Sequence, residues 1–121
     1  MAYRDRKPSA EELLLDIVEW SERLAGHVEG ATVESFLRDA RLQDAACRCL
    51  EVIGEAAGRL RALDPGLQHR HPDFDLARAY AARNWLAHGY AVVDYTIVWN
   101  AATQSVPRMA AAARALLSGG D

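Results

Sequence analysis

The segment from residue 83 to residue 90 gathers residue types that can act on a phosphodiester. Arg83 carries a permanent positive charge on a planar set of donors, which suits a phosphate group. His88 can accept and return a proton near neutral pH. Asn84 lies four positions before His88, so on a helix the amide can orient the imidazole ring. The segment therefore predicts an active site in which His88 moves protons and Arg83 stabilises charge on a phosphate, with Asn84 in support.

Arg83 and His88 are five positions apart, which places them about 140° apart around an ideal helix. They can meet through the long reach of the arginine, through an unwound helix end at Gly89, or through a second copy of the chain. This geometry favours a composite site across a homodimer.

A purely structural role also fits these residues. An arginine near the carboxyl end of a helix interacts favourably with the helix dipole, and a histidine there can bond to the last carbonyl groups. Trp85 and Tyr90 are of the type that more often packs in a core. Residue types and spacing alone leave both interpretations open, and the structural one is the more common outcome for such pairs.

Four residues of the kinds that bind metals stand just before this segment. They are His69, His71, Asp73 and Asp75. They fall in a predicted loop, whereas ligand sets usually need elements that converge. We therefore expect no metal and no other cofactor.

Glu51 and Glu55 share a face of a predicted helix and could act as paired carboxylates. Arg48 and Arg59 stand at helical spacing from them, so ion pairs on a solvated surface are the expected outcome. His27, near the end of the first predicted helix, is expected to be a cap.

Cys47 and Cys49 are two positions apart, so on a helix their thiols point about 200° apart and cannot bridge each other. The sequence holds no further cysteine for a zinc site. We expect two free cysteines in a reducing compartment.

Length and composition predict one globular domain over residues 1–121. Half of the residues are apolar and 26% are charged, which is ordinary for a folded protein. No apolar run reaches the roughly 18–20 residues that span a bilayer, and residues 1–8 lack the apolar core of a secretory signal. We expect a soluble cytoplasmic protein without a membrane partner, flexible at residues 1–8 and 118–121.

The net charge of −3 argues against indiscriminate binding of nucleic acids, which usually requires a basic surface. The charges are unevenly divided. Residues 9–58 carry eleven acids and four arginines, whereas residues 59–121 carry seven arginines and five acids. The second half is therefore the better candidate for contact with an anion.

The spacing of apolar residues predicts about five helices and no strands. The first helix begins after Ser9, with Glu12 at the position that completes a capping box. Its end is bracketed by Gly26 and Gly30. Thr32 is the expected cap of a short second helix.

A long third helix is expected over residues 41–63, followed by a loop over residues 67–73. Asp73 or Asp75 is expected to cap a fourth helix that runs to about His88. The motif residues would then lie at the carboxyl end of that helix.

Asp94 is the expected cap of a fifth helix that runs to Leu117, and Pro107 should kink or break it. Short connections between successive helices favour antiparallel neighbours. The predicted fold is an all-α, up-down bundle.

Arg83, His88 and Tyr90 match the pattern R-x4-H-x-Y, which resembles the signature of the HepT toxins in the HEPN (higher eukaryotes and prokaryotes nucleotide-binding) superfamily. Two further blocks support the resemblance. Residues 43–57 resemble the third helix of that family, and residues 94–99 resemble the opening of its last helix.

The resemblance extends over roughly residues 10–117 and implies a HEPN-like helical homodimer that cleaves RNA, with the motif arginine and histidine as catalytic residues. Such proteins are usually paired with a nucleotidyltransferase antitoxin, MntA, which transfers AMP to the motif tyrosine, here Tyr90. The chain would then be the toxin of a toxin–antitoxin system. Residues 71–75 depart from the family pattern, because the tryptophan that often follows the proline is absent; this concerns the loop rather than the catalytic residues.

A non-catalytic protein is the alternative: a HEPN-like module that binds a nucleotide or a partner nucleotidyltransferase and never cuts RNA. The acidic composition favours it, because a ribonuclease must attract its substrate with few cations to spare. His88 discriminates between the two, since a binding module needs no titrating histidine.

Overall fold

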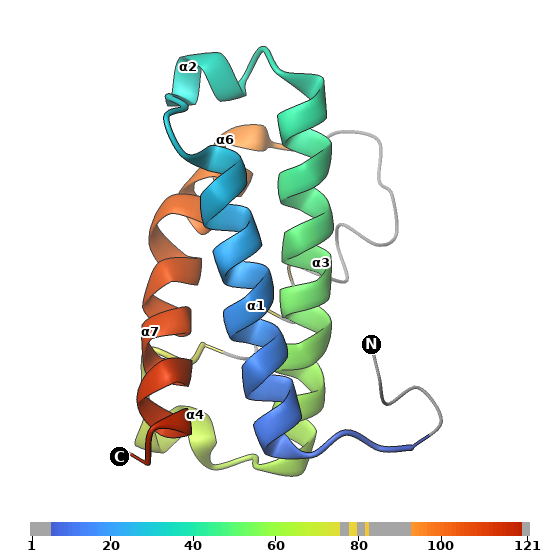
Figure 1. Cartoon of the computed structure of the whole chain (residues 1–121), viewed down its shortest axis with the longest axis vertical. Helices are drawn as coiled ribbons and strands as arrows, with labels where there is room; N and C mark the ends of the chain where they lie inside the picture. Colours follow the sequence, from blue (N-terminus) through green and yellow to red (C-terminus); the bar gives the residue numbers. More distant parts are fainter. Residues whose placement is uncertain (1–5, 76–77, 80–81, 83–92, 120–121) are drawn as a thin grey trace.

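The computed structural model describes residues 6–75, 78–79, 82 and 93–119. All regular elements in these ranges are helices, as predicted, and none of them is both long enough and apolar enough to cross a membrane. Helix α1 (Ala10–Val28) packs most extensively against α3 (Ala40–Leu63) and next against α7 (Val106–Leu117). Figure 1 shows that α3 and α7 both run antiparallel to α1.

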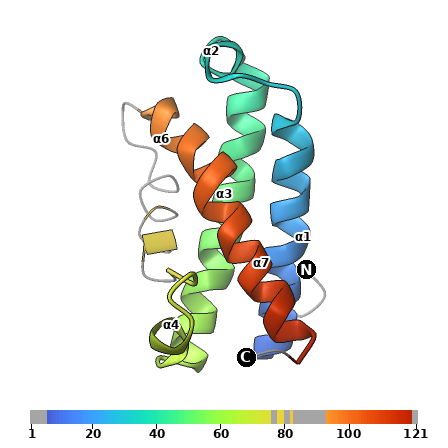
Figure 2. The ribbon, with the colours of Figure 1, turned by 90° about the vertical axis from the view of Figure 1, so that its left-hand side faces the viewer.

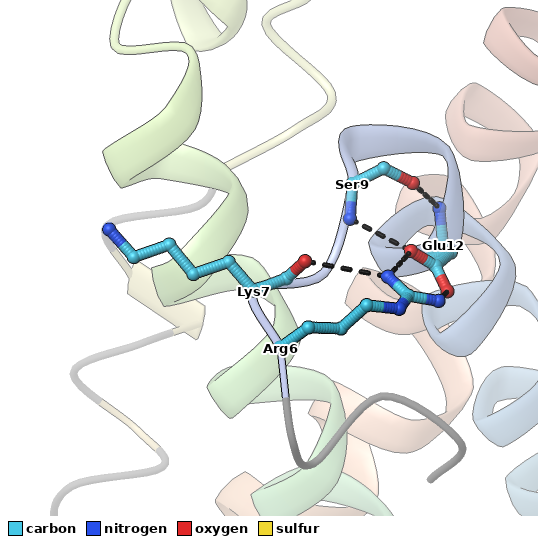
Figure 3. Close-up of polar contacts among 4 residues, drawn as sticks. All are labelled: Arg6, Lys7, Ser9 and Glu12. Atoms are coloured by element: carbon cyan, nitrogen blue, oxygen red, sulfur yellow. Dashed lines mark hydrogen bonds and ion pairs between the residues drawn. The ribbon is translucent and has the colours of Figure 1, made fainter.

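Helix α1 begins with the predicted capping box. The Ser9 hydroxyl accepts a hydrogen bond from the Glu12 backbone N–H at 3.1 Å, and the Ser9 N–H donates to the Glu12 carboxylate at 3.0 Å. Arg6 adds two bonds to the same carboxylate, at 2.8 and 2.7 Å (Figure 3). Hydrogen bonds from Arg6 and then from the Ser9 backbone lower the pKa of Glu12 to about 2. The start of α1 is thus fixed by residues within a few positions of each other.

The following turn and the start of α2 also agree with prediction, and α3 begins at Ala40, one residue before the predicted start. Helix α1 ends at Val28, and Gly30 then adopts φ +79°, a conformation that glycine reaches without steric cost. Thr32 caps α2 (Val33–Phe36) by accepting a bond from the N–H three residues on, at 3.1 Å. Asp39 caps α3 in the same way, also at 3.1 Å.

The core forms where the apolar stripes of the long helices meet. Its fully enclosed side chains include Leu13, Ile17, Leu24, Phe36, Ile53, Leu60 and Phe74. At one end of the bundle, the Phe36 ring lies 6.3 Å from the Tyr95 ring and 5.3 Å from the Trp99 ring, measured between centroids. Both of those rings belong to α6 (Tyr95–Asn100). Figures 1 and 2 place α2 and α6 together at this end and α4 (Leu67–Arg70) at the other.

The loop predicted over residues 67–73 is wrong in its first half, because Leu67–Arg70 form the short helix α4. The Leu67 side chain is buried in the core, and Arg70 forms an ion pair with Asp64 at the end of α3. The Arg70 side chain passes so close to Gly66 that a Cβ atom there would lie 2.9 Å from the guanidinium. These contacts hold a turn of helix in a segment too short to show a periodic pattern.

Pro107 does not break the last helix, which is continuous from Tyr95 to Leu117. The predicted disturbance takes the form of a π-helical segment, η1 (Ala101–Ser105), between α6 and α7. At its end the Val106 N–H donates to the carbonyl five residues back. A proline ring in a regular α-helix clashes with the carbonyl four residues before it, and the wider turn of η1 accommodates the ring.

Candidate functional site

The four predicted site residues, Arg83, Asn84, His88 and Tyr90, lie outside the described residues. Before them the structure describes residues up to 75, 78–79 and 82, and after them it describes residues from 93 onward. The part of the site that the structure covers is therefore the set of residues on either side of 83–92.

On the N-terminal side, Asp75 bonds to the backbone of residues 78 and 79, which are helical. Its carboxylate accepts a hydrogen bond from the Arg78 N–H at 3.2 Å, and its carbonyl accepts one from the Ala79 N–H at 3.1 Å. Phe74, immediately before it, is fully buried. The sequence predicted either Asp73 or Asp75 as a helix cap here, and it is Asp75 that accepts the capping bond.

On the C-terminal side, Asp94 caps α6 as predicted. Its carboxylate accepts hydrogen bonds from the N–H groups of Thr96 at 3.0 Å and Ile97 at 3.4 Å. Val93 and Val98 pack into the core on either side of the cap. The first residues after the motif segment are therefore held both by polar bonds and by apolar contacts.

Both flanks are anchored in one core. Phe74 and Ala79 before the motif, and Val93 and Val98 after it, belong to the same apolar cluster. Residues 83–92 thus lie between two parts of the chain that are held by side-chain hydrogen bonds and apolar contacts, the kind of support that a catalytic site requires.

The paired carboxylates of α3 take the expected structural role. Arg59 lies 2.8 Å from the Glu55 carboxylate, and Arg48 lies 3.9 Å from that of Glu51. All four side chains are partly exposed, so each pair contributes at most about 1 kcal/mol to stability.

Within the ranges the structure covers, no group of three or more histidine, cysteine, aspartate or glutamate residues is placed to hold a metal ion. These ranges include His69, His71, Asp73 and Asp75, the four residues of metal-binding type for which no metal was expected. The first of these lies in α4, and all four side chains are at least partly open to solvent.

Cys47 and Cys49 are free, as predicted. Cys49 is buried and Cys47 is half-buried. Burial raises the pKa of the Cys47 thiol to about 11 and raises that of Cys49 as well. Both thiols are therefore protonated near neutral pH and are poor nucleophiles.

The sequence did not predict a groove between α1 and α3, which has a volume of about 500 Å³. Its lining comprises Trp20, Arg23, Gly26, His27, Ala45, Arg48 and Cys49. The Arg23 guanidinium carbon lies 4.2 Å from the centroid of the Trp20 ring, and that of Arg48 lies 6.0 Å from it. Trp20 and Arg23 stand three positions apart on α1, but Arg48 comes from α3, so this cluster exists only once the helices pack. His27, expected only as a cap, is exposed beside it.

Sequence similarity to known proteins covers both the motif and the residues on either side of it. A family model described as ribonuclease HepT-like matches residues 17–116. The chain belongs to the HepT-like ribonuclease family. The match includes residues 83–90 and both of the flanks that the structure describes, and it confirms the family predicted from the motif.

Three curated relatives show how far the likeness to HepT-like proteins extends. The chain is 29% identical over 103 residues to a Thermococcus cleftensis protein that carries the name ‘Probable ribonuclease HepT’, covering 85% of this chain and 91% of the relative. Two proteins of Methanocaldococcus jannaschii, both named as RNases, are 28% identical over 103 residues and 30% identical over 101. Those alignments cover 85% and 84% of this chain, and 83% and 81% of the relatives. No solved structure gives a significant match.

Proposed function

We propose that this HepT-like protein is an endoribonuclease that cleaves RNA without a metal ion, using Arg83 and His88 as catalytic residues and Asn84 in support. The family match over residues 17–116 carries the proposal, because it contains the whole R-x4-H-x-Y segment. The names of the relatives, which are those of ribonucleases, agree with it.

The chemistry requires few groups because RNA carries its own nucleophile. His88 removes the proton from a 2′-hydroxyl, and that oxygen attacks the adjacent phosphorus. Arg83 stabilises the negative charge that builds up on the phosphorane oxygens. The bond to the 5′-oxygen then breaks, and this oxygen takes a proton from an imidazolium, that of the same His88 or that of the second copy. The products are a 2′,3′-cyclic phosphate on one fragment and a 5′-hydroxyl on the other.

A homodimer would complete this site. On an ideal helix Arg83 and His88 would stand about 140° apart, which favours a pairing between copies, and two histidines would allow the base and acid roles to be divided. Mixing Arg83→Ala protein with His88→Ala protein tests this, because a mixed dimer regains one intact composite site. Restored cleavage supports a site shared between copies and shows that one histidine serves it, whereas a mixture as inactive as its parts contradicts a shared site with one histidine.

Tyr90 is the proposed point of regulation. A nucleotidyltransferase antitoxin of the MntA kind would join its phenol oxygen to the α-phosphate of ATP and release pyrophosphate. The added AMP carries negative charge beside the place where RNA phosphates must bind, so repulsion and bulk both oppose the substrate. In this role the protein is the toxin of a cytoplasmic toxin–antitoxin system.

The cleavage reaction is tested with several RNA classes in excess EDTA, after intact mass has established that Tyr90 is unmodified. Wild-type protein is compared with His88→Ala and with His69→Ala, which removes an exposed histidine in α4. We expect cleavage by the wild type and the His69 variant, none by the His88 variant, and cyclic phosphate ends. Fragments with 3′-hydroxyl ends would refute the mechanism.

The non-catalytic alternative is favoured by one observation, the net charge of −3. It predicts that wild type and His88→Ala bind a nucleotide or a nucleotidyltransferase equally well and that neither cuts any RNA. The modification of Tyr90 is tested separately, by intact mass after incubation with the nucleotidyltransferase and ATP. A mass increase that survives Tyr90→Phe would exclude this residue as the acceptor.

A further inference from the structure

The groove between α1 and α3 combines an aromatic ring with two guanidinium groups. Trp20 is partly buried and packs against the core, which holds its ring in place. Arg23 lies over that ring at 4.2 Å and Arg48 lies at 6.0 Å, both measured from the guanidinium carbon to the ring centroid. Helices α1 and α3 lie side by side along their length, so the cluster sits on a rigid surface (Figure 1).

Both arginines are available to a ligand. Arg23 is exposed and its guanidinium carbon lies over the Trp20 ring, so a further planar group can pack against this pair. Arg48 forms its ion pair with Glu51 at 3.9 Å, and its side chain is 68% exposed. Such a pair is weak in water, so Arg48 can exchange this carboxylate for a phosphate.

Part of the groove lining is small and uncharged. Gly26 and Ala45 contribute almost no bulk, and a Cβ atom added to Gly26 would meet nothing within 4 Å. Cys49 also lines the groove and is buried with its thiol protonated, so it does not repel an anion. A volume of about 500 Å³ falls within the range of about 300–1,000 Å³ that is usual for small-ligand sites.

We propose that this groove binds single-stranded RNA outside the cleavage site. One base extends the stack formed by Trp20 and Arg23, and Arg23 and Arg48 hold flanking phosphates. His27 lies at the rim as a further donor. The inference deepens the proposed ribonuclease function and rests on it for the identity of the nucleic acid.

The chemistry of the groove favours RNA over an acidic protein segment. Base stacking on an aromatic ring, with cations along the backbone, is the usual way in which single strands are bound without sequence preference. An acidic peptide would use the two cations but has no need of the ring between them. Arg23 and Arg48 also give this acidic chain a local positive charge that attracts a polyanion.

The test measures affinity for a fluorescent 2′-O-methyl oligouridylate, which lacks the nucleophilic hydroxyl and so is not cleaved by the proposed chemistry. Binding by wild-type protein is compared with Trp20→Leu, Arg23→Gln, Arg48→Gln and the double arginine variant. Arg61→Gln and Arg108→Gln remove the same charge from exposed sites on α3 and α7 and are the matched controls. Circular dichroism melting checks that every variant is folded.

We expect Trp20→Leu to weaken binding at least about fivefold and the double arginine variant to weaken it at least about tenfold, against less than twofold for the controls. The dependence of the logarithm of affinity on that of salt concentration should become shallower by about 1.4 in the double variant, since each phosphate contact on a single strand contributes about 0.7. An abasic oligonucleotide should bind wild type and Trp20→Leu alike.

Three results would overturn the inference. Groove variants that bind like the controls would show that the strand lies elsewhere. Equal competition by a polyglutamate of matched charge would identify a site for acidic protein segments. A change in the mass of the particle in solution, specific to the groove variants, would identify an interface between copies. Cleavage by the wild type together with normal binding by the groove variants defeats only the groove, whereas groove-dependent binding without any His88-dependent cleavage defeats only the proposed catalysis.

Discussion

Replacing Phe36 by alanine is expected to lower the free energy of unfolding by about 3–5 kcal/mol, because a fully buried phenylalanine is lost. The ring also makes an edge contact with Tyr95 and a tilted contact with Trp99. Aromatic pairs add about 0.5–1.5 kcal/mol beyond the burial of area, so Phe36→Leu, which keeps most of the apolar volume, should cost about 1–2 kcal/mol.

The effect should be local before it is global. Phe36 joins α2 to α6, and α6 receives the chain directly after residues 83–92, so its loss loosens one support of the motif. Urea denaturation followed by circular dichroism gives the free energies, and hydrogen exchange shows where protection is lost. We expect the amides of α6 to lose more protection than those in the middle of α1.

The neighbouring residue supplies the control. Leu37 is 46% exposed, so Leu37→Ala should change stability by no more than about 0.5 kcal/mol. If Phe36→Ala cost as little as the control, the packing of α2 on α6 would be refuted. A uniform loss of protection across all helices would refute the idea that this residue supports α6 in particular.

Three further outcomes follow from the caps and from one exposed glycine. The pKa of Glu12 lies at about 2, below its ordinary value of 4.5. The free energy of unfolding that Glu12 adds relative to Glu12→Gln should therefore be constant above about pH 5, decline as the pH falls from there and vanish near pH 2. A difference that grew on acidification would contradict the capping box. Gly26 lies inside α1 with open space around it, so Gly26→Ala should stabilise the protein by about 0.5–1 kcal/mol in a thermal melt, and a destabilisation would show that its environment is not open. Asp94→Ala should cost about 1 kcal/mol and reduce cleavage, while Asp94→Ser restores both; equal losses in the two variants would mean that the cap is not the reason.

The caps were predictable from sequence because their bonds are local. Ser9, Thr32 and Asp94 each bond to an N–H group two or three residues ahead, so a short window contains both partners. The apolar stripes of α1 and α3 were predictable for a similar reason, since helical spacing repeats within one element.

The features that the sequence did not predict depend on distant partners. The helix at Leu67 exists because its side chain enters a core made by other helices. The cluster at Trp20 needs Arg48 from α3, and that arginine was assigned only to Glu51 because sequence spacing shows neighbours on one helix alone. The catalytic roles of Arg83 and His88 came from the motif and remain predictions.

The π-helical segment ahead of Pro107 has a consequence for the length of this chain. A π-helical turn holds one residue more than a regular α-helical turn. That extra residue rotates all later side chains by about 100° around the helix axis. Val98 and Ala102 before or within the segment, and Val106 after it, all face the core, so the apolar stripe has been fitted to the wide turn. Deleting one residue from Ala101–Ser105 would rotate α6 against α7 and turn Trp99 away from Phe36, even though no core side chain had been altered. The number of residues in η1 therefore sets the orientation of α6 relative to α7, in addition to the contacts that hold both helices in place.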